Sequence, residues 1–371
     1  MQSNSTRDND KEIIVKFVCK GGLLENADVW RRQLPAHAPV WGRCRFIFDP
    51  DARDYDWLVA YDDLPPDISG AKPHTRRIEQ LACPREHTLL ITAEPSTIKV
   101  YGSDFLGQFG HVLTSQEPWA IRHPHAIFSQ PALRWYYGVP YGDDHVTLRR
   151  YEDIQTNKPL SKQHVISTVT SSKKMRYTLH RSRHRFIQRL KTAVPELEIF
   201  GHGVRPIVDK ADALDGFRYH VAIENHISEH HWTEKLSDAF LGCTLPFYSG
   251  CPNAADYFPA KSFIPIDINY IDESIDIIKE SIRNDEYEKR LPHILEARQL
   301  VLEKYNIFAV LDRQISQLHD PARSVMKHAS IKSRHAIRRN VRGYSRYLLE
   351  RTGMLWRRQH SDNKHHNTST Q

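Results

Sequence analysis

Residues 217–250 carry the clearest hydrophobic pattern in the chain. Apolar residues at every second position across 219–223 predict a short buried strand. A polar, histidine-rich loop follows, and Thr233 can then cap a helix that has an apolar stripe at helical spacing. Gly242 is placed to end that helix, and residues 245–248 begin another strand. This order of elements predicts a βαβ unit, and α/β proteins bind ligands at such polar loops.

The rest of the chain alternates in the same way, with apolar runs of strand length separated by polar or helical stretches. This pattern predicts an α/β fold with open, mostly parallel sheets. No GxGxxG stretch is present, so a dinucleotide site is not supported. The expected strands cover 13–19, 44–48, 57–61, 89–92, 111–114, 165–170 and 197–200, and further helices are expected around 180–190, 273–282 and 292–304.

We expect two domains joined by a linker. A chain of 371 residues is long enough for two domains of ordinary size. The polar stretch 143–160 is the candidate linker. The expected division is a disordered N-terminus at 1–12, an N-terminal domain at 13–150, a C-terminal domain at 160–320 and a basic amphipathic helical tail at 321–371.

The amino-acid composition limits the cellular compartments and the binding partners that we expect for this protein. The five cysteines are scattered without a CxxC pair, which argues against a zinc knuckle or a disulfide framework and favours a reducing, cytoplasmic location. The first residues form no apolar signal segment, and no run approaches the length of a transmembrane helix. The net charge is +7, and residues 322–371 hold twelve Lys and Arg against two acids. The basic charge therefore belongs to the tail, and no nucleic-acid-binding module is visible.

The tail itself has amphipathic spacing. Ile337, Val341, Tyr344 and Leu348 recur at intervals of three and four among arginines, which predicts a basic amphipathic helix. Two interpretations stay open. The helix either lies on anionic lipid, as a peripheral contact with the inner face of the cytoplasmic membrane, or packs on its own domain.

The 217–250 block resembles the donor-binding motif of glycosyltransferase family 10, the α1,3/α1,4-fucosyltransferases. Segments 257–259 and 262–267 also fit, so the resemblance covers the C-terminal half well and the N-terminal half loosely. The residues that carry it are Glu224, Asn225, Thr233, Glu234, Lys235, Ala239, Pro246 and Gly250.

This resemblance implies a GT-B fold, in which two Rossmann-like domains face each other across a cleft. The N-terminal domain would bind the acceptor, and the C-terminal domain would bind the sugar nucleotide. The implied reaction is the inverting transfer of L-fucose from GDP-fucose to a hydroxyl of an acceptor glycan, such as lipopolysaccharide or another surface glycan. The family requires no metal or other cofactor for donor binding, and the chain looks like a bacterial-type soluble member. Two rival interpretations are a glycosyltransferase for another nucleotide sugar and a non-catalytic glycan-binding protein of the same fold.

Donor binding is expected at the start of the predicted helix. A helix N-terminus favours anions, and Lys235 adds a full positive charge there. The resemblance assigns Glu234, Lys235 and Asn225 to donor contacts. Glu224 is also a position of the family motif, but it can instead tie the loop together. The alternatives are a solvated Glu-Lys pair and a turn asparagine that bonds its own backbone.

Two further residues complete the predicted chemistry. Arg183 fits the family's helix-start arginine, which would clamp phosphate oxygens, although Arg181 and Arg185 are close rivals. Glu94 follows an apolar strand and is the candidate catalytic base, which would take the proton of the acceptor hydroxyl. The alternative for Glu94 is a loop acid that caps the following turn. The sequence departs from the family at Pro95, directly after this glutamate, which leaves the acceptor and the sugar open.

His231 is another departure, because many family members have tyrosine there; a histidine can also hydrogen-bond a phosphate in the donor site. No metal site is predicted, since the histidine-rich loop lacks ligand spacing and no DxD triplet follows an early strand. Residues 135–137 and Trp119 are aromatic, and they either offer stacking surfaces to sugars or pack in the core.

Overall fold

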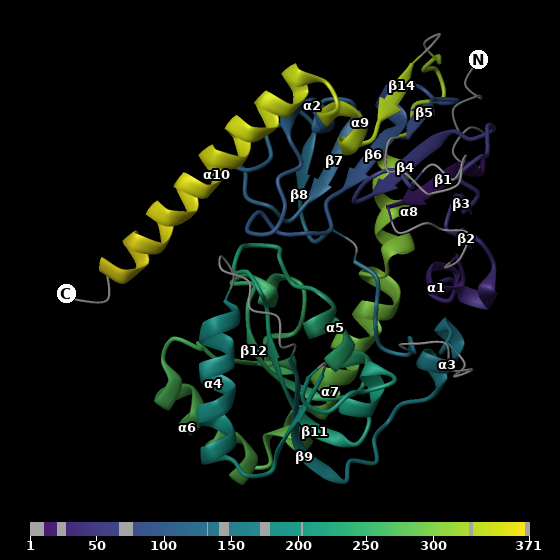
Figure 1. The fold of residues 1–371 in the computed structure, drawn as a ribbon. Coiled ribbons are helices and arrows are strands. Elements are labelled where there is room, and N and C mark those ends of the chain that lie inside the picture. The colour runs from purple at the N-terminus through teal and green to yellow at the C-terminus, as the bar shows by residue number, and fades with distance from the viewer. Residues whose placement is uncertain are drawn as a thin grey trace, which may run out of the picture. The chain divides into compact units, whose positions relative to one another are not determined.

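The computed structural model describes residues 11–20, 27–66, 77–131, 133–140, 148–170, 179–201, 203–325 and 329–367. These residues fall into two compact units. The first unit combines residues 1–27, 42–131 and 312–371, and the second combines 28–41 and 132–311. Each unit is built on its own sheet (Figure 1).

The first unit is built on a seven-stranded sheet, in which all the pairings from β3 to β8 are parallel. The strand order is β2-β3-β1-β4-β6-β7-β8, with β2 at the division between the units. Its central strands are buried on both faces, as expected for a parallel sheet. The strands are β1 (Ile13–Cys19), β2 (Val40–Trp41), β3 (Cys44–Ile47), β4 (Trp57–Tyr61), β6 (Thr88–Ile91), β7 (His111–Thr114) and β8 (Ala126–Phe128).

The C-terminal part of the chain completes this first unit. Strand β14 (Ser330–Lys332) pairs antiparallel with β5 (Ile78–Gln80), and Ile331 lies opposite Glu79. The short helices are η2 (Arg85–His87), α2 (Ser103–Leu106) and α9 (Arg334–Arg338), and the long helix is α10 (Val341–Asn367).

Helix α8 (Ile307–Leu318) starts in the second unit and ends in the first, where two uncharged histidines hold the chain that follows it. Trp57 Nε1 donates to His319 Nδ1 over 3.1 Å. His87 stacks on the Trp57 ring, and its Nε2 accepts from the Asp320 amide over 3.2 Å. Its Nδ1 lies 3.2 Å from the Asp56 carbonyl, which can only accept, so His87 carries its single proton on Nδ1.

The second unit has a five-stranded parallel sheet in the order β10-β9-β11-β12-β13. Figure 1 shows α4 and α6 on one side of this sheet and α5 and α7 on the other. The strands are β9 (His164–Val169), β10 (Leu197–Phe200), β11 (Phe217–Ile223), β12 (Leu245–Ser249) and β13 (Ile264–Pro265). The helices are α1 (Ala27–Arg31), η1 (Pro35–His37), α3 (Tyr151–Thr156), α4 (His180–Ala193), η3 (Lys210–Ala213), α5 (Glu234–Leu241), η4 (Ala254–Asp256), η5 (Ala260–Ser262), α6 (Ile271–Arg283), α7 (Glu286–Gln299) and the π-helix η6 (Leu300–Lys304).

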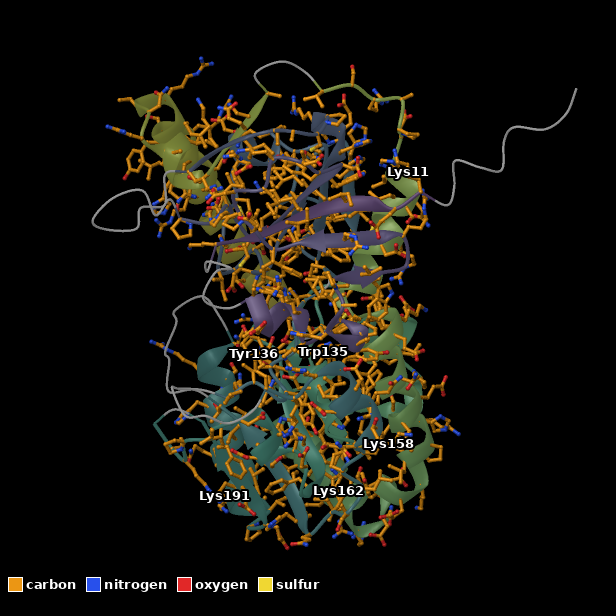
Figure 2. All side chains as sticks on the ribbon, turned by 90° about the vertical axis from the view of Figure 1, so that its right-hand side faces the viewer. Lys11, Trp135, Tyr136, Lys158, Lys162 and Lys191 are labelled. Carbon is orange, nitrogen blue, oxygen red and sulfur yellow. The ribbon has the colours of Figure 1, made fainter. Side chains whose placement is uncertain are left out.

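Figure 2 shows the two ends of the second unit, with Trp135 and Tyr136 at one end and Lys162 and Lys191 at the other. Lys162 precedes the first strand of the sheet, so it marks the amino edge. Its ammonium group donates to three carbonyls, including that of Gly242 at the end of α5. The polar residues that directly follow β11 therefore belong to the opposite, carboxyl edge.

The predicted α/β class is confirmed, and both units have the Rossmann-like parallel sheets expected of a GT-B protein. The domain limits differ from those predicted. The predicted linker at 143–160 lies partly outside the described residues, and its described part belongs to the second unit, where it includes α3. Arg149 there pairs with Asp215 over 2.7 Å. The predicted disordered residues 1–12 lie outside the described part except for 11 and 12.

The predicted tail at 321–371 also differs, because it contains a strand and two helices instead of one. Asn340 separates the helices, and its Oδ1 accepts from the Arg342 amide over 3.0 Å, as a helix-capping side chain does. Helix α10 is held to the first unit by Glu350, which accepts from the Ser103 amide, and by Arg346, which pairs with Asp104. The opposite face is exposed at Val341, Tyr344, Leu348 and Leu349.

Candidate functional site

The candidate site lies at the carboxyl edge of the sheet in the second unit. Strands β9 and β11 run parallel, so Val169 and Ile223 end at the same edge. Glu224 and Asn225 directly follow β11, and α5 starts from the same edge at Glu234. The sequence therefore brings the polar loop and the helix N-terminus together, as the βαβ pattern predicts.

Glu224 fastens the start of α5 to the end of β11. Its carboxylate is fully buried and accepts from the Thr233 amide over 2.8 Å and from the Thr233 hydroxyl over 2.8 Å. Thr233 is the N-cap of α5, as predicted, and its hydroxyl accepts from the Lys235 amide. A Cβ at Gly250 would lie 2.5 Å from Glu224 Cγ, so only glycine leaves room for this carboxylate. Glu224 thus ties the loop together, which is one of its two predicted roles.

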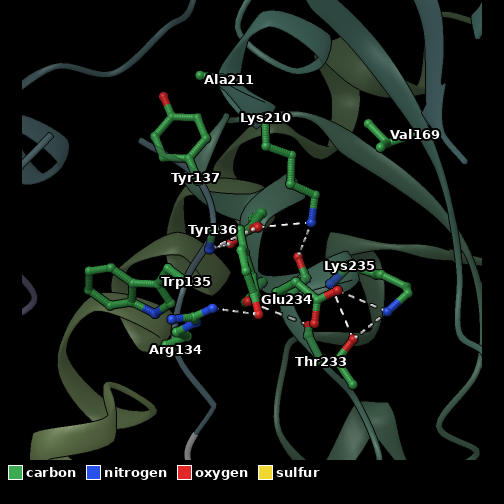
Figure 3. Close-up of polar contacts among 12 residues, drawn as sticks. Arg134, Trp135, Tyr136, Tyr137, Val169, Lys210, Ala211, Thr233, Glu234 and Lys235 are labelled. Atoms are coloured by element: carbon green, nitrogen blue, oxygen red, sulfur yellow. Dashed lines mark hydrogen bonds and ion pairs between the residues drawn. The ribbon is translucent and has the colours of Figure 1, made fainter. Parts of the chain in front are cut away.

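Lys235 lies between the carboxylates of Glu234, which Figure 3 shows beside it, and of Glu224. Its Nζ lies 2.9 Å from Glu234 Oε1 and 3.4 Å from Glu224 Oε2. Burial works against the charge on Lys235, but Glu234 and Glu224 outweigh burial and raise its pKa. Burial likewise opposes ionisation of Glu234, but Lys235 and Lys210 hold the pKa of Glu234 well below its usual range. Burial raises the pKa of Glu224, whose attraction to Lys235 does not cancel this effect.

A second buried ion pair supports the same helix, and the sequence analysis did not identify it. Lys210 Nζ lies 2.9 Å from Asp238 Oδ2 and donates over 2.9 Å to the carbonyl of Glu234 (Figure 3). Asp238 is fully buried and also accepts from the Tyr136 amide, with both oxygens at 3.3 Å. The sequence does contain one indication of this ion pair. Asp238 lies on the apolar side of α5, four residues after Glu234, and a buried carboxylate needs a cation as its partner.

Arg183 on α4 contacts the site at Asn225, in the loop that follows β11. It is 7% exposed, and its guanidinium donates to Asn225 Oδ1 over 3.3 Å and to the Val169 carbonyl. Its Nε finds no hydrogen-bond partner among the residues that the structure describes. Burial lowers the pKa of Arg183, and the attraction of Glu224 and Glu234 only partly offsets this. The rivals Arg181 and Arg185 are exposed, so Arg183 is the arginine at this edge.

His231 is also buried, and its amide donates to the Ser228 carbonyl over 3.3 Å. Its ring lies 5.5 Å from that of His226, measured between centroids. The adjacent His230 has a positive φ of 64° and bonds the Tyr257 hydroxyl over 2.6 Å. Across the described residues, no group of three or more His, Cys, Asp or Glu is arranged to hold a metal ion.

Glu94 belongs to the first unit, whereas the other six predicted site residues belong to the second. It follows β6 at the carboxyl edge of its own sheet, and its side chain is exposed. Trp135 and Tyr137 are buried in the core of the second unit, so the packing interpretation holds for these two aromatic residues. Tyr136 is half-buried, and the Arg134 guanidinium lies 4.6 Å from its ring centroid.

Comparison with known proteins gives a partial match. No family model matches the chain. A 74-residue segment is 35% identical to the alpha-(1,3)-fucosyltransferase FucT of Helicobacter pylori, and it covers 20% of this chain and 16% of that protein. The sequence is thus fucosyltransferase-like over a short segment, and the chain aligns with only 16% of the relative's length.

Solved structures give weak similarities over longer spans. A crystal structure of an alpha1,3-fucosyltransferase aligns with a TM-score of 0.46 at 16% identity, and the alignment covers 78% of this chain and 83% of that one. A crystal structure of an alpha1,3-fucosyltransferase with GDP-fucose aligns with a TM-score of 0.44 at 15% identity, over 82% of this chain and 94% of that one. Among the helices of the described residues, none combines the length and apolar character needed to cross a bilayer.

Proposed function

We propose that this chain is a glycosyltransferase that transfers L-fucose from GDP-fucose to a hydroxyl of an acceptor glycan, with inversion at the anomeric carbon. One observation carries the proposal: Arg183, Asn225 and Lys235 converge where α5 begins at the carboxyl edge of the second sheet. The segment similar to a fucosyltransferase supports the choice of sugar. GDP as the nucleotide follows from that choice.

The donor diphosphate would lie against the start of α5, where the positive end of the helix dipole favours an anion. Arg183 is suited to bind a phosphate oxygen, because its buried Nε has no partner within the described residues. Lys235 is suited to stay protonated, because two carboxylates raise its pKa. Asn225 and Glu234 would contact the sugar or ribose hydroxyls. His231 would be close enough to this edge to contribute a hydrogen bond.

The reaction would be one displacement. The acceptor oxygen attacks the anomeric carbon, the bond from that carbon to the β-phosphate oxygen breaks, and GDP leaves with the bonding electrons. Glu94 would take the acceptor proton as general base. Arg183 and Lys235 would stabilise the charge that develops on the leaving diphosphate, so we expect turnover without an added divalent metal.

The test is calorimetry of GDP binding to the wild-type chain and to Lys235→Ala. We expect wild type to bind GDP and the variant to lose at least about tenfold in affinity, because an ion pair to phosphate is removed. Lys279→Ala is the matched control, since Lys279 is an exposed lysine on α6 of the same unit. If a folded wild-type chain does not bind GDP, the assignment of this edge to GDP-fucose is wrong.

A second measurement separates the rival functions. Incubation with GDP-fucose should release GDP slowly even without acceptor, and 10 mM EDTA should not slow the release. Binding of another nucleotide diphosphate in preference to GDP would indicate a different sugar donor. Binding of glycans without any turnover by the folded protein would indicate a non-catalytic glycan-binding protein.

A further inference from the structure

The segment that carries Glu94 is unusually well fastened for a surface loop. We call residues 93–101 the Glu94 loop. The Glu94 side chain is exposed, while both polar groups of its backbone are bonded to buried side chains. The loop also closes on itself, because the amides of Ile98 and Lys99 each donate over 3.0 Å to the Pro95 carbonyl.

Tyr101 binds the amide side of the loop. It is 3% exposed, and its hydroxyl accepts from the Ala93 amide over 3.0 Å and from the Glu94 amide over 3.4 Å. The same hydroxyl donates over 2.6 Å to Asp62 Oδ1. A phenol has one proton to donate and two lone pairs, so all its capacity is used. Burial and then Asp62 raise the pKa of Tyr101 far above its usual value, which keeps the hydroxyl protonated.

Asp62 determines which hydrogen bonds the Tyr101 hydroxyl donates and which it accepts. It directly follows β4, with φ at 72°, and its amide donates over 2.8 Å to the Ile91 carbonyl at the end of β6. An ionised carboxylate only accepts hydrogen bonds, so it commits the Tyr101 proton and turns the lone pairs toward the loop amides. Lys99 pairs with the other oxygen of Asp62 and compensates its charge.

Gln116 binds the carbonyl side. It lies just beyond β7 and is 2% exposed. Its Nε2 donates over 2.7 Å to the Glu94 carbonyl and over 3.1 Å to the Lys99 carbonyl. The backbone amide of Gln116 donates to Thr114 Oγ1 over 3.0 Å. Two buried side chains from different places in the sequence thus hold the Glu94 peptide from opposite sides.

We propose that Tyr101 and Gln116 are positioning residues that place the Glu94 carboxylate for proton abstraction. This inference rests on the proposed function, in which Glu94 is the base. General-base catalysis requires the carboxylate within hydrogen-bond reach of one hydroxyl, and an exposed side chain on a mobile backbone would sample many positions. Anchoring the peptide on both sides leaves only the side-chain torsions of Glu94 to adjust.

A purely structural role for Tyr101 is the competing explanation. Its ring also packs in the first unit, where the Arg334 guanidinium lies 5.3 Å and Lys99 Nζ 5.0 Å from the ring centroid. Tyr101→Phe keeps this ring and removes only the hydroxyl. Tyr55→Phe is the matched control, because Tyr55 is a buried tyrosine of the same unit whose hydroxyl accepts from the Ala82 amide over 3.1 Å.

The experiment measures kcat, donor KM and amide hydrogen exchange for both variants. We expect Tyr101→Phe to lower kcat by about 10- to 100-fold with donor KM unchanged, since sub-ångström displacement of a catalytic group costs that much. Exchange at Ala93 and Glu94 should become faster. Tyr55→Phe should leave kcat and both amides unchanged at a comparable loss of thermal stability.

A double-variant cycle decides whether Tyr101 acts through Glu94. In the Glu94→Gln background, Tyr101→Phe should lower kcat no further, because the group it positions is gone. Additive losses would overturn the proposal. If Tyr101→Phe does not fold, Gln116→Met tests the carbonyl side in the same way, because it keeps the volume and loses the donor.

The outcomes also separate this inference from the proposed function. If Glu94→Gln leaves kcat unchanged, Glu94 is not the base and the proposed mechanism fails. If Glu94→Gln abolishes turnover while Tyr101→Phe and Gln116→Met both leave kcat unchanged, the positioning role alone is overturned.

Discussion

The carboxyl edges of the two sheets are built by opposite means. In the second unit, the edge consists of buried and half-buried charged side chains that neutralise one another, as Lys235 does with Glu224 and Lys210 with Asp238. In the first unit, the edge at Glu94 is held by hydrogen bonds to backbone groups, and the carboxylate itself is exposed.

This difference has a physical consequence for how each edge tolerates change. A buried charge that loses its partner costs several kcal/mol, whereas an exposed carboxylate can be replaced at little cost. The second edge therefore couples ligand binding to folding stability, and at the first edge the two are separable. Mutations at the two edges should fall into different classes.

The largest expected effect tests that contrast directly. Lys210→Met leaves Asp238 buried without its cation and should lower the free energy of unfolding by about 3–5 kcal/mol. Glu94→Gln should change it by less than about 0.5 kcal/mol, because its side chain is exposed. Urea unfolding followed by circular dichroism measures both.

Adding Asp238→Asn to Lys210→Met should recover much of the loss, since no unpaired charge then remains. Equal stability losses for Lys210→Met and Glu94→Gln would contradict the contrast between the two edges.

A smaller effect concerns the response of the first unit to acid. Burial and then His319 lower the pKa of His87, which Asp56 and Asp320 oppose, and burial also lowers the pKa of His319. An unfolded histidine has a pKa of about 6.5. Below this pH the unfolded chain therefore binds more protons than the folded chain does. The free energy of unfolding should be highest above about pH 6.5 and should decrease as the pH falls below it.

Denaturant unfolding at pH 7.5, 6.5 and 5.5 measures the slope of the free energy of unfolding against pH. His87→Gln should reduce it, because glutamine can make both hydrogen bonds and does not titrate. His293→Gln is the control, since His293 is a half-buried histidine on α7 of the second unit. A slope that is unchanged in His87→Gln would show that the hydrogen bonds of His87 do not cause the acid sensitivity.

The smallest expected effect concerns α10. We propose that its exposed face, Val341, Tyr344 and Leu348 flanked by arginines, makes peripheral contact with anionic lipid. Arg342→Glu should weaken binding to phosphatidylserine-containing vesicles by about 1 kcal/mol or more, and the wild type should bind phosphatidylcholine vesicles poorly. Vesicle co-sedimentation at two salt concentrations measures both.

Arg189→Glu is the control, because Arg189 is an exposed arginine on α4 of the second unit. Equal loss in both variants, or no binding by the wild type, would leave α10 as a helix that only packs on its own unit.

The parts of the fold that follow from local patterns were predictable. The strand–helix–strand order around α5 and the Thr233 cap depend on short-range periodicity. The placement of Arg183 and Asn225 in one site was predicted from the resemblance to the family motif, and their side chains are in contact. The sequence does not reveal pairings between distant segments. Lys210 on η3 meets Asp238 on α5, and Tyr101 meets Asp62 just after β4, only because the fold brings these separate segments together. The same reason explains why the domain limits were misplaced.

The return of the last segment to the first unit determines the order in which the protein can be completed during synthesis. Every strand of the second sheet lies within residues 164–265, so that sheet can assemble as soon as this stretch has left the ribosome. The strands of the first sheet emerge earlier, but the first unit lacks β14, the partner of β5, and the histidine-held end of α8 until residues 312–332 are made. The unit that is translated first is thus the last to close, and its apolar strands are the part of the nascent chain with the longest need for a chaperone.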